Sequence, residues 1–334
     1  MSNCCTVMRE MSNERKRLVI SHRIFLSFIA RKTTSMKNIF TFQSIALTAA
    51  FIVLATTLRA DEASWRDVAR RAAADGTVLL KNEASALPLA EGTKVALFGA
   101  PTLLVSGGGS AKVNPSRKID IAEGLEMAGL KVVNPTECPM AGIVLITRKS
   151  REGRDNSNKA FALSEEELAF VAEAKRVCGK AVVVVNAGHL VGLKPLKESA
   201  DCDAILYAWF TGQEGGAALG EIIAGRVNPS GRLADTLAAN PADWPGSGDF
   251  RKSKATLAYS EGEAVGYRYF NAKAPEKIVY PFGWGLSYTT FSESKPKVDA
   301  ATGDVLITVS NTGARSGRHS VLYYEGGELL AYGK

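Results

Sequence analysis

The run Ala181-Val182-Val183-Val184-Val185-Asn186 decides the fold class, because it is the plainest strand in the chain. It carries no alternation between apolar and polar side chains until its last residue. Near-continuous apolar runs of this length are typical of strands in parallel sheets that helices cover on both faces. A second run, Lys94-Val95-Ala96-Leu97-Phe98-Gly99, has the same character and ends at a glycine. We therefore expect a parallel sheet between two layers of helices.

Further strands and helices alternate on either side of these two runs. Strands are expected at 130–133, 143–146 and 204–209, and helices at 121–128, 164–178 and 215–224. Ser164 and Glu167 form a capping box at the start of one helix. An earlier helix is expected to begin after Ser64 and to continue its apolar face through Val78 and Leu79. Such alternation implies right-handed βαβ units and a doubly wound, mostly parallel sheet, an α/β sandwich domain over residues 62–245.

The pattern changes after Pro245. Residues 246–290 form a connecting segment that is rich in glycine and aromatic residues. Residues 305–310 alternate and end at a turn signal, Asn311-Thr312-Gly313, and residues 321–324 form a further strand. These are the opening strands of an immunoglobulin-like β-sandwich, which would need about seven. Residues 291–334 are therefore expected to form an incomplete β-sandwich.

The first 60 residues are expected to lie outside the fold. Residues 36–60 have a short basic start, a mostly apolar stretch and a small residue, Ala60, before Asp61 and Glu62. This layout is typical of a secretory signal peptide cleaved after Ala60, so we expect a secreted or periplasmic protein. The apolar stretch is shorter than about 18 residues, so no stable membrane span is expected. Residues 1–35 are interpreted as an upstream extension from a mis-chosen start codon.

Composition excludes several classes of function. The net charge of +7 in 334 residues derives largely from the first 60. The sequence contains no basic stripe interleaved with aromatic residues, so nucleic-acid binding is not expected. Outside that leader the chain has three cysteines without metal-ligand spacing, Cys138, Cys178 and Cys202, and its histidines are scattered. No metal or cofactor is expected.

Glu152 is the carboxylate with the clearest chemical potential. It lies in a loop that also contains Gly153, just after the predicted strand at 143–146. Open α/β sheets bind ligands outside the carboxyl ends of their strands, so this loop is well placed to reach one. A lone acid can donate a proton, but most sugar-cleaving chemistry needs a second carboxylate that faces it.

Seven motifs, in order along the chain, resemble the C-terminal portion of family 3 glycoside hydrolases, the β-glucosidase-like enzymes. The resemblance covers almost everything from residue 65 onward, including the start of the fibronectin type III-like domain of that family. The motifs are ARRAAADGTVLLKNEASALPL (69–89), GGGSAKV (107–113), REGRD (151–155), GQEGG (212–216), NPSGRLADT (228–236), VGYRYF (265–270) and YPFGWGLSYTTF (280–291).

The resemblance implies a retaining mechanism on a β-linked oligosaccharide or aryl glycoside, with Glu152 as the general acid/base. It also implies substrate contacts from the two loops around this residue, at Gly108, Gly109, Ser110, Arg151 and Asp155. In the family the nucleophilic aspartate lies in a separate (β/α)8 barrel, and this chain has no room for the roughly 250 residues of a barrel. The chain is thus interpreted as carrying the acid/base half of a divided site, and as inactive alone.

Two departures from the family pattern bear on Glu152. Arg151 replaces a glycine and Asn156 replaces an arginine. Arg151 and Arg154 flank the carboxylate, and nearby cations favour its ionised form, which opposes the acid role. The alternative to an acid/base role for Glu152 is that its loop is a solvated charged turn. For residues 107–110, the alternatives to sugar binding are a flexible turn and a phosphate cradle, although the loop lacks the P-loop spacing.

Domain order resembles the permuted branch of the family, in which the sandwich precedes the barrel. On that interpretation the chain is the front piece of a longer enzyme. The alternative is a non-catalytic carbohydrate-binding or scaffolding remnant. A flavodoxin-like nucleotide binder ranks last, because no Gly-x-Gly-x-x-Gly loop follows the first strand. The sequence does not select the sugar.

Overall fold

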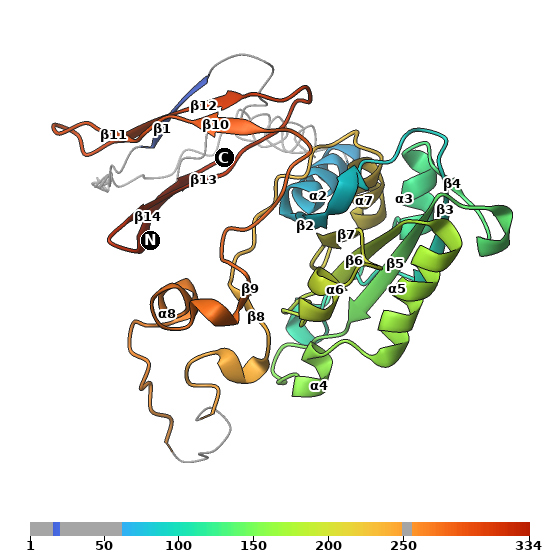
Figure 1. The fold of residues 1–334 in the computed structure, drawn as a ribbon, viewed down its shortest axis with the longest axis horizontal. Coiled ribbons are helices and arrows are strands. Elements are labelled where there is room, and N and C mark those ends of the chain that lie inside the picture. The colour runs from blue at the N-terminus through green and yellow to red at the C-terminus, as the bar shows by residue number, and fades with distance from the viewer. Residues whose placement is uncertain (1–15, 21–61, 249–255) are drawn as a thin grey trace, which may run out of the picture.

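The structure, a computed structural model, describes residues 16–20, 62–248 and 256–334. The signal peptide predicted at 36–60 lies outside the described residues. Most of the described chain forms one α/β unit, and short strands at the C-terminal end form smaller sheets beside it (Figure 1).

A six-stranded sheet organises the α/β unit. Its spatial order is β2-β7-β6-β5-β3-β4, with β2 antiparallel to β7 and every other neighbouring pair parallel. In chain order the strands are β2 (Val78–Asn82), β3 (Lys94–Gly99), β4 (Lys131–Val132), β5 (Ala141–Arg148), β6 (Ala181–Ala187) and β7 (Ala204–Tyr207). The predicted doubly wound, mostly parallel sheet is confirmed, and the valine run is its central strand β6.

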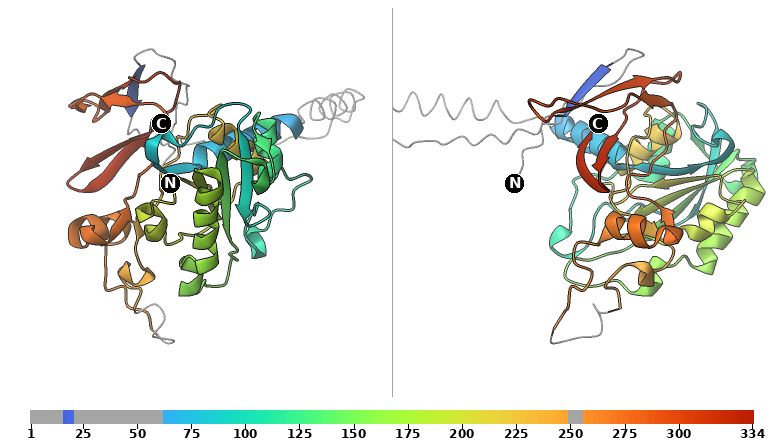
Figure 2. Two further views of the ribbon diagram at one scale, coloured as in Figure 1. Left: turned by 45° about the vertical axis from the view of Figure 1, so that its right-hand side comes forward. Right: turned by 60° about the vertical axis from the view of Figure 1, so that its left-hand side comes forward.

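Helices cover both faces of this sheet, as Figures 1 and 2 show. One face packs on α2 (Glu62–Gly76), α3 (Ile121–Met127) and α7 (Gly215–Ile223), and the other on α5 (Glu165–Cys178) and α6 (Lys194–Glu198). Successive side chains of a strand point to opposite faces. Val182 and Val184 accordingly join the first core, whereas Val183 and Val185 join the second. A strand buried on both sides needs apolar side chains at every position, which explains the valine run.

Helices α3 and α7 contact each other through glycine. A Cβ atom added to Gly124 would collide with the Gly216 carbonyl oxygen, and one added to Gly220 would collide with the Gly124 carbonyl oxygen. The two backbones therefore pack directly against one another. This contact also fixes the start of α3, where Asp120 caps the helix and accepts a hydrogen bond from Leu103 N at 2.9 Å.

The edge strand β2 differs from the prediction. Residues Val78 and Leu79 were expected to extend a helix from Ser64, but α2 begins at Glu62 and ends at Gly76, and both residues lie in β2. Thr77 closes the helix by donating from Oγ1 to Ala73 O at 2.8 Å. Periodicity could not reveal this, because β2 takes its conformation from its partner β7 across more than a hundred residues of chain.

The remaining elements lie after β7 or connect the strands. Strand β5 is longer than predicted, since Thr147 and Arg148 belong to it. The short helices are α4 (Asn158–Phe161) and α8 (Gly266–Lys273), with single 3-10 turns at Glu83–Ser85, Gly109–Ala111, Pro135–Glu137, Pro241–Asp243 and Pro275–Lys277. A two-stranded pair, β8 (Leu237–Ala238) with β9 (Ile278–Tyr280), precedes a segment that returns along β2, where Leu286 N donates to Leu79 O at 2.7 Å.

The C-terminal strands form two small antiparallel sheets. They are β10 (Phe291–Glu293), β11 (Lys297–Val298), β12 (Val305–Asn311), β13 (Val321–Glu325) and β14 (Glu328–Gly333). The pattern at 305–310 and 321–324 predicted β12 and β13. Strand β12 also pairs with β1 (Lys16–Ile20), which lies in the segment interpreted as an upstream extension. These sheets share a core of Val305, Ile307, Val309 and Val321 and are consistent with a β-sandwich.

No helix in the described ranges 62–248 and 256–334 combines the length and the apolar character of a membrane span.

Candidate active site

The loops that follow β3, β5, β6 and β7 gather at the carboxyl ends of these strands, and Asn186 at the end of β6 connects two of them. Asn186 is fully buried near the end of β6. Its Oδ1 accepts from Leu104 N at 2.6 Å, and its Nδ2 donates to Leu104 O at 3.1 Å and to Trp209 O. A buried amide that satisfies three backbone groups fixes the loops after β3 and β7 relative to β6.

Glu152 lies at the tip of a tight turn beyond β5. Arg151 and Arg154 form an antiparallel bridge on its two sides. Gly153, at the turn, has φ of +74° and open space around it, a conformation that favours glycine. Glu152 is exposed, so the turn presents its side chain to solvent.

The glycine-rich loop lies against this turn. Gly108 N donates to Ser150 O at 2.9 Å, Glu152 N donates to Gly108 O at 3.2 Å, and Gly108 and Arg151 form a parallel bridge. Ser110 donates from its hydroxyl to Oε2 of Glu152. The backbone of Gly109, at φ +76°, passes so close to Glu152 that an added Cβ would lie 3.3 Å from the Glu152 carbonyl oxygen.

Five of the six predicted site residues thus lie together, namely Gly108, Gly109, Ser110, Arg151 and Glu152. The sixth, Asp155, is exposed just beyond the turn. Among the ion pairs of the described residues, none joins Glu152 to Arg151 or Arg154, so the flanking cations do not contact the carboxylate. What the cluster offers chemically is one exposed carboxyl group with a hydroxyl donor bound to it.

Arg148, the last residue of β5, lies at the base of the same loop. It pairs with both oxygens of Glu167 on α5, and the two side chains are only 14% and 18% exposed. Partial burial works to raise the pKa of Glu167, but hydrogen bonds from Arg148 and Ser164 outweigh it and hold that pKa below its ordinary value. Glu167 also accepts from Ser164 N at 2.8 Å, which confirms the predicted capping box.

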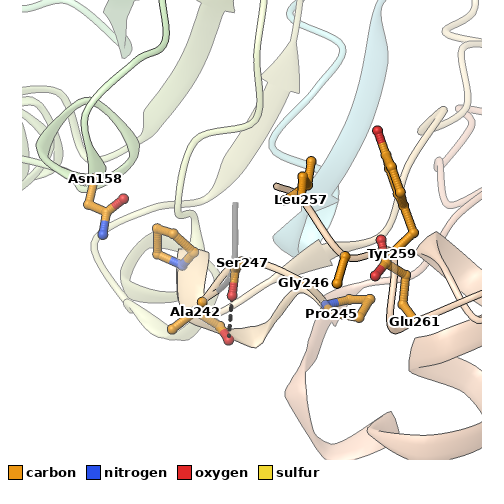
Figure 3. A pocket seen from close by; sticks show the side chains of 11 residues that line it. Asn158, Ala242, Pro245, Gly246, Ser247, Leu257, Tyr259 and Glu261 are labelled. Atoms are coloured by element: carbon orange, nitrogen blue, oxygen red, sulfur yellow. Dashed lines mark hydrogen bonds between the residues drawn. The ribbon is translucent and has the colours of Figure 1, made fainter. Parts of the chain in front are cut away.

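A hollow of about 440 Å³ lies beside α4, further along the chain than the Glu152 turn (Figure 3). Asn158 lines one side, and the opposite side comes from the stretches that flank residues 249–255, including Leu257, Tyr259 and Glu261. Ser247 and Ala242 also line the hollow, and the Ser247 hydroxyl donates to Ala242 O at 3.2 Å. Glu152 is not among the residues that line it. The hollow and the predicted acid/base are therefore separate features.

Three further polar or aromatic residues in the family motifs have structural partners. Glu214 is buried at the N-cap position of α7 and forms an ion pair with Arg66 at 2.6 Å. Trp284 donates from Nε1 to Leu80 O at 3.0 Å, and the Tyr288 hydroxyl donates to Ile222 O at 3.1 Å. These two aromatics pack the returning segment against the α/β unit.

Two residues that shape the site were not predicted from the sequence. Asn186 carried a signal, since it is the one polar residue that ends the valine run. Arg148 carried none, because a cation after an apolar strand is ordinary and its partner lies 19 residues further on.

Fold and site together define an α/β domain that carries an exposed carboxylate on a loop at the carboxyl edge of its sheet. Residues 77–288 match the model of the glycosyl hydrolase family 3 C-terminal domain. The chain belongs to glycoside hydrolase family 3.

Relatives support this assignment. Beta-glucosidase A of Butyrivibrio fibrisolvens is 32% identical over 76% of this chain, and an exo-alpha-(1->6)-L-arabinopyranosidase of Bifidobacterium longum is 28% identical over 80%. Among solved structures, beta-glucosidase 3B of Thermotoga neapolitana in complex with glucose matches 78% of the chain with a TM-score of 0.70 and 29% identity. The chain spans 40% of the length of each of these two relatives and 43% of that structure.

Proposed function

We propose that this chain supplies the general acid/base half of a retaining β-glycosidase, with Glu152 as the acid/base. The observation that carries the proposal is the exposed turn at the carboxyl end of β5, which presents Glu152 beside the glycine-rich loop with the Ser110 hydroxyl bound to it. The family match and the similarity to β-glucosidases support the reaction class. The substrate class is a β-linked oligosaccharide or aryl glycoside.

In this mechanism Glu152 first protonates the glycosidic oxygen and later removes a proton from the incoming water. The nucleophile comes from a (β/α)8 barrel that the family pairs with this domain. The Glu152 carboxyl group is exposed in this chain. A barrel that covers it would exclude water from it. Desolvation favours the protonated form, which is the form an acid needs. Gly108, Gly109, Ser110, Arg151 and Asp155 are proposed to contact the sugar from the two paired loops.

Two further proposals concern the ends of the chain. Residues 36–60 would direct export to the periplasm or the exterior by the signal-peptide layout. Residues 291–334 would begin a fibronectin type III-like sandwich, which the alternating strand β12 and its small core support.

The test is a chimera in which residues 62–334 replace the matching segment of the Butyrivibrio fibrisolvens enzyme. Two substrates separate the chemistry. A 2,4-dinitrophenyl β-glucoside has a leaving group that needs no protonation, whereas a methyl β-glucoside depends on the acid. We expect Glu152→Gln to slow cleavage of the methyl glucoside by about 10²- to 10⁴-fold, the usual contribution of general acid catalysis. The first chemical step on the dinitrophenyl substrate should change far less.

Glu166→Gln, which alters an exposed glutamate in the first turn of α5, is the matched control and should leave both rates unchanged. Azide should restore turnover of the dinitrophenyl substrate by the Glu152→Gln chimera and yield a β-glucosyl azide. Equal loss of kcat/KM, which reports the first chemical step, on both substrates would refute the acid/base role. Turnover by the unmodified chain alone would refute the divided site. Sugar binding that is independent of Glu152, without hydrolysis by the chimera, would favour the non-catalytic carbohydrate-binding alternative.

A further inference from the structure

We propose that Arg148 is the positioning residue of the Glu152 loop, fastening both ends of residues 149–163 to the start of α5. The inference rests on the proposed function, because it concerns how Glu152 is presented. Arg148 makes none of its hydrogen bonds with Glu152 and acts through the loop backbone.

All five N–H groups of the guanidinium have acceptors. Nε donates to Ala160 O at 3.0 Å. Nη1 donates to Thr147 O at 3.1 Å and to Oε1 of Glu167. Nη2 donates to Ala162 O at 2.9 Å and to Oε2 of Glu167 at 2.7 Å. A guanidinium has five donors in one plane, so this site uses its full capacity.

These contacts join the two ends of the loop. Arg148 closes β5 on the entry side, while Ala160 and Ala162 lie on the exit side, 12 and 14 residues later. Glu167 connects the same group to α5, because its carboxylate also accepts from the backbone of Ser164.

The exit side of the loop has little freedom to compensate. Phe161 O accepts from Gly192 N at 2.8 Å, and a Cβ added to Gly192 would lie 2.6 Å from the Phe161 ring. The Phe161 ring also meets the Trp244 ring edge-on, with centroids 5.9 Å apart. Residues 158–161 are therefore fixed. Backbone hydrogen bonds with Gly108 hold the Glu152 turn on the entry side, and Arg148 ties the end of β5 to the fixed exit side.

Lysine cannot reproduce this site. It carries the same charge but has three donors on a single flexible ammonium group, so it cannot reach three carbonyl groups and both oxygens of a carboxylate in one plane. Arg148→Lys thus keeps the positive charge but cannot form the five planar hydrogen bonds of the guanidinium. The matched control is Arg176→Lys, since Arg176 makes a two-point pair with Glu173 on the exposed face of the same helix α5.

The first measurement is hydrogen–deuterium exchange of the full chain, followed by mass spectrometry. Arg148→Lys should raise exchange of residues 149–163 by about tenfold or more, the expected consequence of losing at least one charge-assisted hydrogen bond. Exchange in β6 should stay within about twofold of wild type. Glu167→Gln, a second variant that conserves shape, should raise exchange of the same loop, and Arg176→Lys should not.

The second measurement uses the chimera and the two substrates of the acid/base test. Arg148→Lys should reduce kcat/KM, which reports the first chemical step, more on the methyl glucoside than on the dinitrophenyl glucoside, by at least about fivefold, because only the methyl leaving group needs a correctly placed acid in that step. A merely structural role would lower both rates together. Unchanged loop exchange, exchange raised equally in β6, or equal loss on both substrates would each overturn the positioning role. If Glu152→Gln itself shows no difference between the substrates, the proposed function fails, and the exchange result still decides whether Arg148 fastens the loop.

Discussion

The glycine contact between α3 and α7 predicts a large effect from one added methyl group. A Cβ at position 220 would collide with the Gly124 carbonyl oxygen and would lie 3.0 Å from Leu125 N. Both are backbone atoms and cannot rotate away, so the helices must separate. Because Asp120 at the start of α3 holds Leu103 N, the displacement would reach the loop that carries Ser110.

The magnitude of Gly220→Ala follows from two opposing terms. Overpacking a close contact costs about 1–3 kcal/mol, and a contact between two backbones belongs at the upper end. Alanine in a helix interior gains about 1 kcal/mol over glycine. The net loss is therefore about 2 kcal/mol, which lowers the Tm of a domain of this size by roughly 4–8 °C.

The assay is urea unfolding followed by circular dichroism, with the midpoint and slope fitted separately. Gly76→Ala is the matched control, because it places the same methyl group in a helix with nothing within 4 Å. It should be neutral or stabilising by up to about 1 kcal/mol. A Gly220→Ala midpoint equal to or above that of wild type would refute the inference that these backbones are in contact.

Three further outcomes are expected. Lys81 donates from its buried ammonium to Lys197 O at 3.0 Å and Ser199 O at 2.9 Å. Lys81→Met should therefore lower the free energy of unfolding by about 1–3 kcal/mol, and a urea midpoint at or above wild type would contradict this. Burial raises the pKa of the Cys202 thiol to about 12, whereas Cys138 is exposed. Iodoacetamide at pH 8 should then alkylate Cys138 well before Cys202, and equal rates by peptide mass spectrometry would count against the buried assignment. The pKa of Glu167 lies below its ordinary value of 4.5, so its stabilising interaction is complete above pH 4.5 and is lost as the pH falls through the folded-state pKa. The stability difference between wild type and Glu167→Gln should shrink over that range, and a difference constant from pH 7 to pH 3 would exclude the interaction.

Part of the candidate site could be predicted from local sequence patterns. The sequence placed Glu152 on a loop at the carboxyl end of a strand, and it placed the glycine-rich loop after another strand. Neighbouring parallel strands bring such loops together, so their proximity was a consequence of fold class. The contact between Ser110 and Glu152, 42 residues apart, needed the register of β3 against β5.

The residues that hold the Glu152 loop could not be predicted from the sequence, for a different reason. An arginine at the end of a strand has many possible partners, and only the position of α5 selects Glu167 and the carbonyl groups of Ala160 and Ala162. The same holds for the glycines of α3 and α7. In the sequence they resemble weak points of a helix, and in the fold they permit its closest contact.

By itself the sequence determined the layered α/β architecture, because burial on both faces demands apolar runs and those runs are visible in the chain. It also determined the start of α5, since a capping box forms between residues three apart. Tertiary structure alone decided that Val78–Asn82 is an edge strand rather than helix, and which groups fasten the Glu152 loop. Such choices depend on partners far away in the chain, and only the folded arrangement brings those partners within hydrogen-bonding distance.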